Sequence, residues 1–148
     1  IMYGVPVPKQ IRTEPPVNLM AVSVIVLSRK NTQSHLKKML RVLLDSDGTK
    51  TMIHRRALPL GVNLMTLNEH QTMSTLAGIY ESGGKVMTSK VHLSELDRNQ
   101  IVESQEALVF DSPCQYGVIV GSDFLLKTGI DICYSTSALE WLGSTIPL

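Results

Sequence analysis

The feature that most constrains the fold is a succession of short apolar runs with almost no helix between them. Residues 18–28 (NLMAVSVIVLS), 38–45 (KMLRVLLD), 106–111 (EALVFD) and 116–121 (YGVIVG) have the length and composition of strands and are bounded by turn residues. Counted along the chain, there are seven or more such runs. This pattern predicts a mainly β barrel or sandwich and not alternating βαβ units.

One helix and three turns are expected among these strands. Residues 122–129 (SDFLLKTG) form the helix, which Ser122 or Asp123 can cap and Gly129 can end. The first two strands are expected to form a hairpin. Turns are also expected at 82–84 (SGG) and at 135–137 (STS).

The length of 148 residues predicts one domain with a substantial core. Four prolines fall within residues 1–18, so this segment is expected to be an extended arm and residues 19–148 the folded domain. The net charge of +1 gives no bias toward nucleic acid, and no apolar run is long enough to span a bilayer. Cys114 and Cys133 form no disulfide framework or metal motif, which favours a reducing, intracellular location.

The stretch RVLLDSDGTK places two carboxylates, Asp45 and Asp47, at the end of an apolar run. Read as apolar-Asp-x-Asp-Gly-Thr, it resembles the nucleophile loop of haloacid dehalogenase-like phosphatases. There the first aspartate attacks phosphate, the second is the general acid/base, and Mg²⁺ bridges carboxylate and phosphate. That chemistry needs a doubly wound parallel sheet, and the residues after Gly48 contain no convincing amphipathic helix. The phosphatase remains the more remote alternative.

Read as apolar-apolar-Asp-Ser, the same stretch resembles the active-site turn of an aspartic protease. Three blocks extend this likeness over about residues 20–143: VLLDSDGTKTMIHRRALP, STLAGIYESGGKV and YGVIVGSDFLLKTGIDICYSTSALEW. Together they are similar to the retropepsin-like protease of a gypsy-like LTR retrotransposon polyprotein. The resemblance implies a retropepsin-like acid protease barrel, with one lobe per chain and one short C-terminal helix.

The resemblance also implies how such a chain works. Two copies pair about a two-fold axis, and each contributes one catalytic aspartate, here Asp45. Ser46, Asp47, Gly48 and Thr49 complete the active-site turn, and Gly121 allows a strand to pass close behind it. The hairpin tip lies over an extended peptide of the polyprotein as a flap formed by Ser74, Thr75, Leu76, Ala77 and Gly78. No cofactor or metal is implied, and the location is the cytoplasm or a retroelement particle.

Two positions depart from the family pattern. Asp47 stands where the family has glycine, which adds a negative charge beside the catalytic carboxylate. Ser122 follows Gly121, where many retroviral relatives carry an arginine that braces the dimer. A second hypothesis follows: a catalytically impaired module of the same fold that serves dimerisation or peptide binding.

Overall fold

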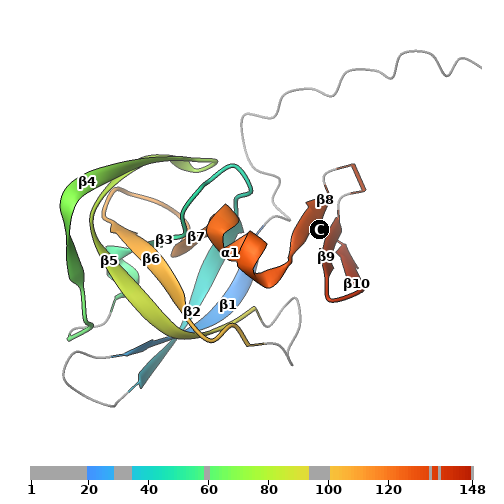
Figure 1. Ribbon diagram of the computed structural model, residues 1–148, viewed down its shortest axis with the longest axis horizontal. Coiled ribbons are helices and arrows are strands. Elements are labelled where there is room, and N and C mark those ends of the chain that lie inside the picture. The colour runs from blue at the N-terminus through green and yellow to red at the C-terminus, as the bar shows by residue number, and fades with distance from the viewer. Residues whose placement is uncertain are drawn as a thin grey trace, which may run out of the picture.

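The computed structural model describes residues 20–28, 35–58, 61–93, 101–133, 135–136 and 138–147. Of residues 20–28, 35–38, 89, 144, 146 and 147 it describes the backbone alone. Within these ranges lie ten strands, one α-helix and one short 3-10 helix (Arg55–Ala57). The fold is therefore mainly β with one short helix near the C-terminus, as the sequence predicts (Figure 1). The elements are β1 (Met20–Ser28), β2 (His35–Leu44), β3 (Met52–His54), β4 (Met65–Thr75), β5 (Gly78–His92), β6 (Gln105–Phe110), β7 (Val118–Val120), α1 (Ser122–Thr128), β8 (Asp131–Cys133), β9 (Ala138–Trp141) and β10 (Ser144–Pro147).

The large sheet closes into a barrel. Its strand order is β1-β2-β7-β3-β6-β5-β4, and an additional pairing of β1 with β5 joins the two sides. The long strand β5 makes this possible, because its first half pairs with β4 while its later residues pair with β6 and β1. The β4–β5 hairpin consequently extends from the barrel as an arm, which arches over one end in Figure 1.

Short strand β7 passes between β2 and β3 at the centre of the sheet. It runs parallel to β2 and antiparallel to β3. Successive residues of β2 and β7 face opposite sides, and both sides are buried: Val42 and Val120 point into the barrel, whereas Leu43 and Ile119 point to a second apolar cluster. Burial on both faces explains why the sequences of these two strands are continuous apolar runs.

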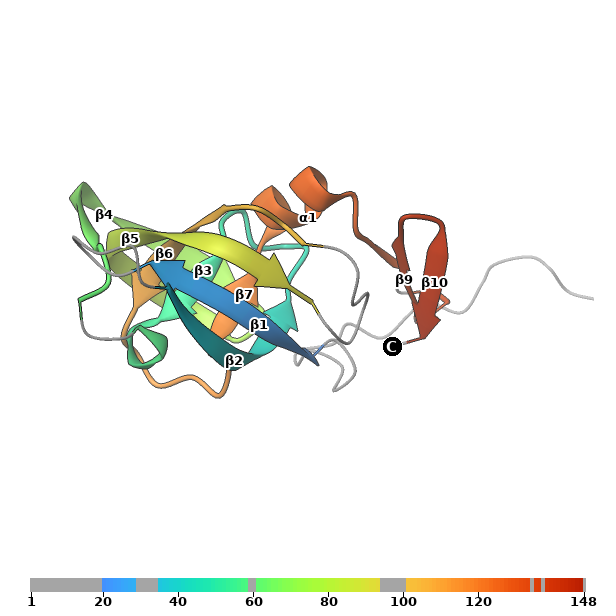
Figure 2. The same cartoon turned by 90° about the horizontal axis from the view of Figure 1, so that it is seen from below.

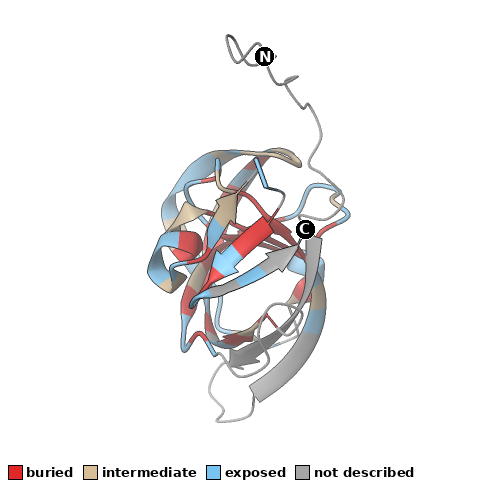
Figure 3. Ribbon diagram, turned by 90° about the vertical axis from the view of Figure 1, so that its right-hand side faces the viewer, coloured by how far each residue is buried: buried red, intermediate tan, exposed pale blue. Residues whose placement is uncertain are grey.

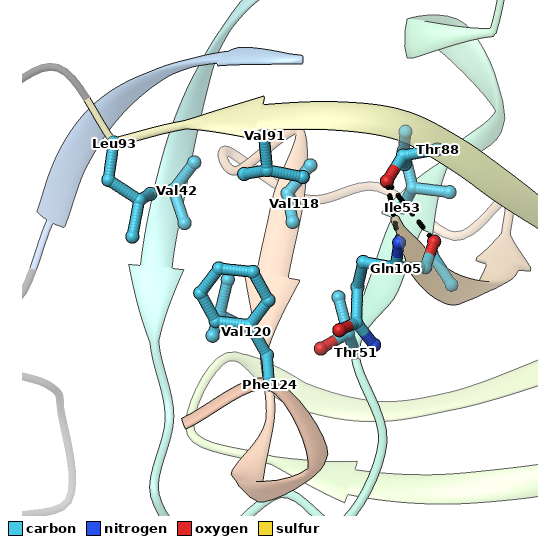
Figure 4. Close-up of a pocket in the computed structure, with 11 residues that line it drawn as sticks. Val42, Thr51, Ile53, Thr88, Val91, Leu93, Gln105, Val118, Val120 and Phe124 are labelled. Carbon is cyan, nitrogen blue, oxygen red and sulfur yellow. Dashed lines mark hydrogen bonds between the residues drawn. The ribbon is translucent and has the colours of Figure 1, made fainter. Parts of the chain in front are cut away.

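Helix α1 covers one end of the barrel. Phe124 is 1% exposed and points from the helix toward Val42, Val91 and Val118, as Figure 4 shows. The space left among these side chains is about 10 Å³, which holds at most one water, so the barrel interior is a core and not a ligand site. Figure 3 shows the same division, with buried residues on the inner strands and exposed residues on the outer side of the helix.

A small second sheet follows the helix and stands beside the barrel (Figure 2). Its order is β10-β9-β8. Trp141 is 5% exposed and anchors this sheet to the helix, because its indole Nε1 donates a hydrogen bond of 3.1 Å to the carbonyl oxygen of Thr128.

Several local predictions are confirmed. The first two strands form an antiparallel hairpin, a turn at 135–136 joins β8 to β9, and Gly129 ends α1 in the left-handed conformation. The predicted cap of that helix was wrong, because Gly121 is the N-cap residue and no side chain caps it.

The predicted turn at 82–84 was also wrong. These residues lie inside β5, opposite a bulge of β4 between Thr66 and Gln71, and the actual turn is at Leu76 and Ala77. Small residues in this chain therefore lie opposite a bulge as well as in a turn.

The predicted arm of residues 1–18 lies outside the described residues. Within the described part, no helix has the length and apolar character needed to cross a membrane.

Gly121→Ala is expected to destabilise the fold strongly. An added Cβ would lie 2.7 Å from the carbonyl carbon of Lys50, which is backbone and cannot move aside. Overpacking of this kind costs about 3 kcal/mol. Gly117→Ala is the matched control, since its Cβ would meet the flexible side chain of Leu40 at 3.0 Å. Chemical denaturation should give a clearly smaller loss for the control; equal losses would contradict the importance of the close approach.

Candidate active site

Asp45 is a fully buried carboxylate at the turn that follows β2. Its side chain is 0% exposed. Oδ1 accepts hydrogen bonds from the backbone N–H groups of Asp47 at 3.0 Å and Gly48 at 3.1 Å. Oδ2 accepts one from the N–H of Leu76 at 2.9 Å. Burial of a carboxylate is costly unless such donors replace water, so the turn is built around this group.

The neighbouring strand β7 fixes the turn from behind. The N–H of Asp45 donates to the carbonyl oxygen of Val120 at 2.8 Å, which continues the β2–β7 pairing into the turn. The N–H of Ser122 donates to the carbonyl oxygen of Gly48 at 2.6 Å. Both ends of the turn are thus tied to the segment that leads into α1.

Gly121 lies where this segment crosses the end of the turn. An added Cβ would lie 2.7 Å from the backbone of Lys50, so only glycine permits the close approach. Its N–H donates to Thr51 Oγ1 at 3.2 Å.

Thr51 belongs to a buried polar network that was not predicted from the sequence. Its hydroxyl donates to Asp123 Oδ1 at 2.8 Å, and Gln105 Nε2 donates to Asp123 Oδ2 at 3.0 Å. Asp123 thereby joins the strand after the turn to α1 and β6. No local pattern in the sequence predicts this network. In the stretch GTKT the two threonines are chemically equivalent, yet Thr51 is buried and Thr49 is exposed.

The other predicted turn residues differ in exposure. Gly48 is buried, Ser46 is half-buried, and Asp47 and Thr49 are exposed. The charge of Asp47 therefore faces water in the single chain, while its backbone N–H holds Asp45. Asp47 contributes the donor that glycine would contribute at this place, and its carboxylate is solvated.

The five predicted flap residues lie at the tip of the β4–β5 hairpin. The turn is held by Thr75, whose hydroxyl donates to the carbonyl oxygen of Gly78 at 2.7 Å and accepts from the N–H of Ala77 at 3.1 Å. Gly78 has φ of +143°, which other residues adopt only with strain. Ser74 is exposed and the other four are half-buried. Figure 1 shows this tip beside the loop that follows β2.

An apolar cluster lies beneath the flap, which we call the floor cluster. Its buried members come from β2, β3, β5, β6 and β7 and from the loop before β7: Leu43, Met52, Tyr80, Leu108, Phe110, Tyr116 and Ile119. Leu76 and Ala77 pack against it from the flap tip. The structure thus brings Asp45, its turn and Gly121 together, and the flap tip joins Asp45 to the buried floor cluster.

Tyr80 links the floor cluster to the flap. Its hydroxyl donates to the carbonyl oxygen of Ala77 at 2.9 Å, and its ring lies 4.6 Å from that of Phe110, measured between centroids. Burial, and then the neighbouring Cys114 thiol, raise the pKa of Tyr80 to about 12. The hydroxyl therefore remains a donor to the flap across the physiological range.

The chemical group that the site offers is the Asp45 carboxylate. Within the described ranges, no group of three His, Cys, Asp or Glu side chains lies close enough to hold a metal ion. The described strands also lack the helices that the phosphatase hypothesis requires between them. A buried carboxylate that is bonded to a hairpin tip, with an apolar cluster beneath that tip, can act on an extended chain once the chain lies under the hairpin.

Similarity to known proteins is found among solved structures. No protein-family model matches the sequence, and no curated protein matches it. Among solved structures, the chain is similar to the crystal structure of the retroviral protease-like domain of Ddi1 from Leishmania major, with 12% identity and a TM-score of 0.46. The match covers 86% of this chain and 93% of that one. The chemistry of the site rests on the geometry around Asp45.

Tyr80 is expected to contribute stability that is lost in strong alkali. Its pKa is raised from 10.0 to about 12 in the folded chain, so the contribution is complete below pH 10 and disappears as the pH rises to about 12. Denaturation at several pH values should show a steeper loss of unfolding free energy over this range in the wild type than in Tyr80→Phe. Identical alkaline profiles would contradict the burial of the Tyr80 hydroxyl beneath the flap.

Proposed function

We propose that the chain is one half of an aspartic endopeptidase and that two copies form the active enzyme. The observation that carries the proposal is the Asp45 carboxylate, which is buried, oriented by the amides of its own turn, and bonded to the tip of a hairpin that packs on the floor cluster. One carboxylate per chain is half of what peptide hydrolysis by an aspartate pair needs. A two-fold axis beside the turn would bring in the second.

In the paired site the two carboxylates would share one proton, because like charges at short distance do not both ionise easily. The ionised Asp45 would take a proton from a bound water, which attacks the scissile carbonyl carbon. The protonated partner would polarise the carbonyl oxygen and then help to protonate the leaving amine. The amides of Asp47 and Gly48 would hold Oδ1 in place throughout, which leaves Oδ2 for the water.

Substrate would lie extended between the flap and the floor cluster. A peptide in this place can add as a strand along the flap hairpin, with apolar side chains directed to the floor. The resemblance of the three sequence blocks to retroelement proteases supports a polyprotein as the natural substrate.

The impaired-module hypothesis rests on Asp47. The exposure of its side chain favours the active enzyme, because a solvated carboxylate perturbs the pair less than a buried one. Asp47→Gly separates the two hypotheses. The variant should have near wild-type activity in an active enzyme, whereas a gain from no cleavage to cleavage would establish the impaired module.

Purified chain is expected to cleave peptides, and Asp45→Asn is expected to abolish the cleavage. The amide cannot act as a general base, so the loss should be about 1,000-fold or more. The measurement is mass spectrometry of a peptide library incubated with the chain between acid and neutral pH. Asp47→Asn is the matched control and should keep most of the activity. Cleavage that survives Asp45→Asn, or Mg²⁺-dependent phosphate release from a generic ester, would overturn the proposal.

A further inference from the structure

The flap tip makes a direct bond to the atom that the proposed mechanism needs. The N–H of Leu76 donates to Asp45 Oδ2 at 2.9 Å, while Oδ1 is already held by the amides of Asp47 and Gly48. The attacking water must hydrogen-bond to the free oxygen of the ionised aspartate. Oδ2 could accept a second hydrogen bond, but Asp45 is 0% exposed in this conformation, so no water reaches this oxygen while Leu76 lies against it.

The Leu76 side chain occupies the floor as well. It packs against the floor cluster together with Ala77, where a substrate side chain would otherwise lie. By contrast, Ile79 on the same hairpin is 72% exposed. The tip is thus directed inward at the carboxylate and the floor, and the adjoining flap residue faces solvent.

Three further hydrogen bonds, made by the side chains of two residues, hold the tip in this conformation. The Tyr80 hydroxyl donates to the carbonyl oxygen of Ala77, and Thr75 closes the turn through two hydrogen bonds of its own. The tip is consequently a preformed turn and not a loose loop. It is anchored at the carboxylate, at Tyr80 and at the apolar floor.

We propose that the flap tip is an intramolecular inhibitor of the site, with Leu76 in the place of both the catalytic water and a substrate side chain. The inference rests on the proposed function and concerns its regulation. The closed chain is latent, and the tip must lift from Asp45 before peptide and water enter. Apparent substrate affinity is then reduced by the fraction of chains that are open.

Amide hydrogen exchange, followed residue by residue by NMR, tests the closed state without requiring any activity. In the wild-type chain, the amide of Leu76 should be protected as are those of Asp47 and Gly48. Asp45→Asn should release it selectively. The asparagine Oδ1 can still accept from residues 47 and 48, but its NH₂ group is a donor and cannot accept from Leu76. Exchange at Leu76 should become roughly 10-fold faster or more, because a charge-assisted bond is lost.

Two further variants complete the test. Leu76→Ala keeps the amide but removes the side chain from the floor, so exchange at residue 76 should also accelerate. Ile79→Ala changes an exposed residue of the same hairpin and should leave that exchange unchanged. Protection at residues 47 and 48 reports that each variant keeps the folded turn.

Unprotected Leu76 in the wild type, or equal exchange in wild type and Asp45→Asn with the turn intact, would overturn the inhibitory contact. These outcomes are independent of cleavage. A chain that cleaves peptides with a freely exchanging Leu76 keeps the proposed function and loses the inhibition. A chain that cleaves nothing but shows the predicted exchange pattern loses the function and keeps the closed flap.

Discussion

The hydrogen bonds to the Asp45 carboxylate are the interaction on which the rest of the site depends. A carboxylate without exposed surface is tolerated only where fixed donors replace its water shell. Two donors come from its own turn and the third from Leu76, which lies 31 residues further along the chain. The conformation of the turn and the position of the flap are therefore set by the same group. The residue proposed for catalysis is also the residue that holds the hairpin closed.

The strand beneath Asp45 is held by more contacts than the flap tip above it. Beneath Asp45, strand β7 is paired on both edges and buried on both faces, and Gly121 lets the chain cross close to Lys50. Above it, the flap tip is attached by a few hydrogen bonds and by the half-buried side chains of Leu76 and Ala77. Elements with few buried contacts open at lower cost than the core. A rigid base beneath a more weakly attached hairpin suits the proposed enzyme, which must admit an extended chain.

The sequence predicted the strands that are buried on both faces, because short continuous apolar runs such as VLL and VIV are typical of strands without a solvent-facing side. The end of the short helix at Gly129 followed from local capping rules, whereas its N-terminal cap did not. The course of the β4–β5 arm could not be predicted, because Ser82 to Gly84 carry turn chemistry yet lie opposite a bulge. The sequence also suggested that Asp45 and the flap approach one another, but only through resemblance. The bond from Leu76, the support from Tyr80 and the Thr51–Asp123–Gln105 network depend on tertiary position, which no local pattern encodes.

The central claim is that one active site takes an Asp45 from each of two chains, and subunit mixing tests it most directly. Wild-type chain and Asp45→Asn chain would be mixed in varying ratio at constant total concentration and left to exchange partners before peptide cleavage is measured. If both carboxylates are required, activity falls as the square of the wild-type fraction, to about a quarter in an equal mixture. Activity that falls in simple proportion to the wild-type fraction would show that one chain suffices and would contradict the account.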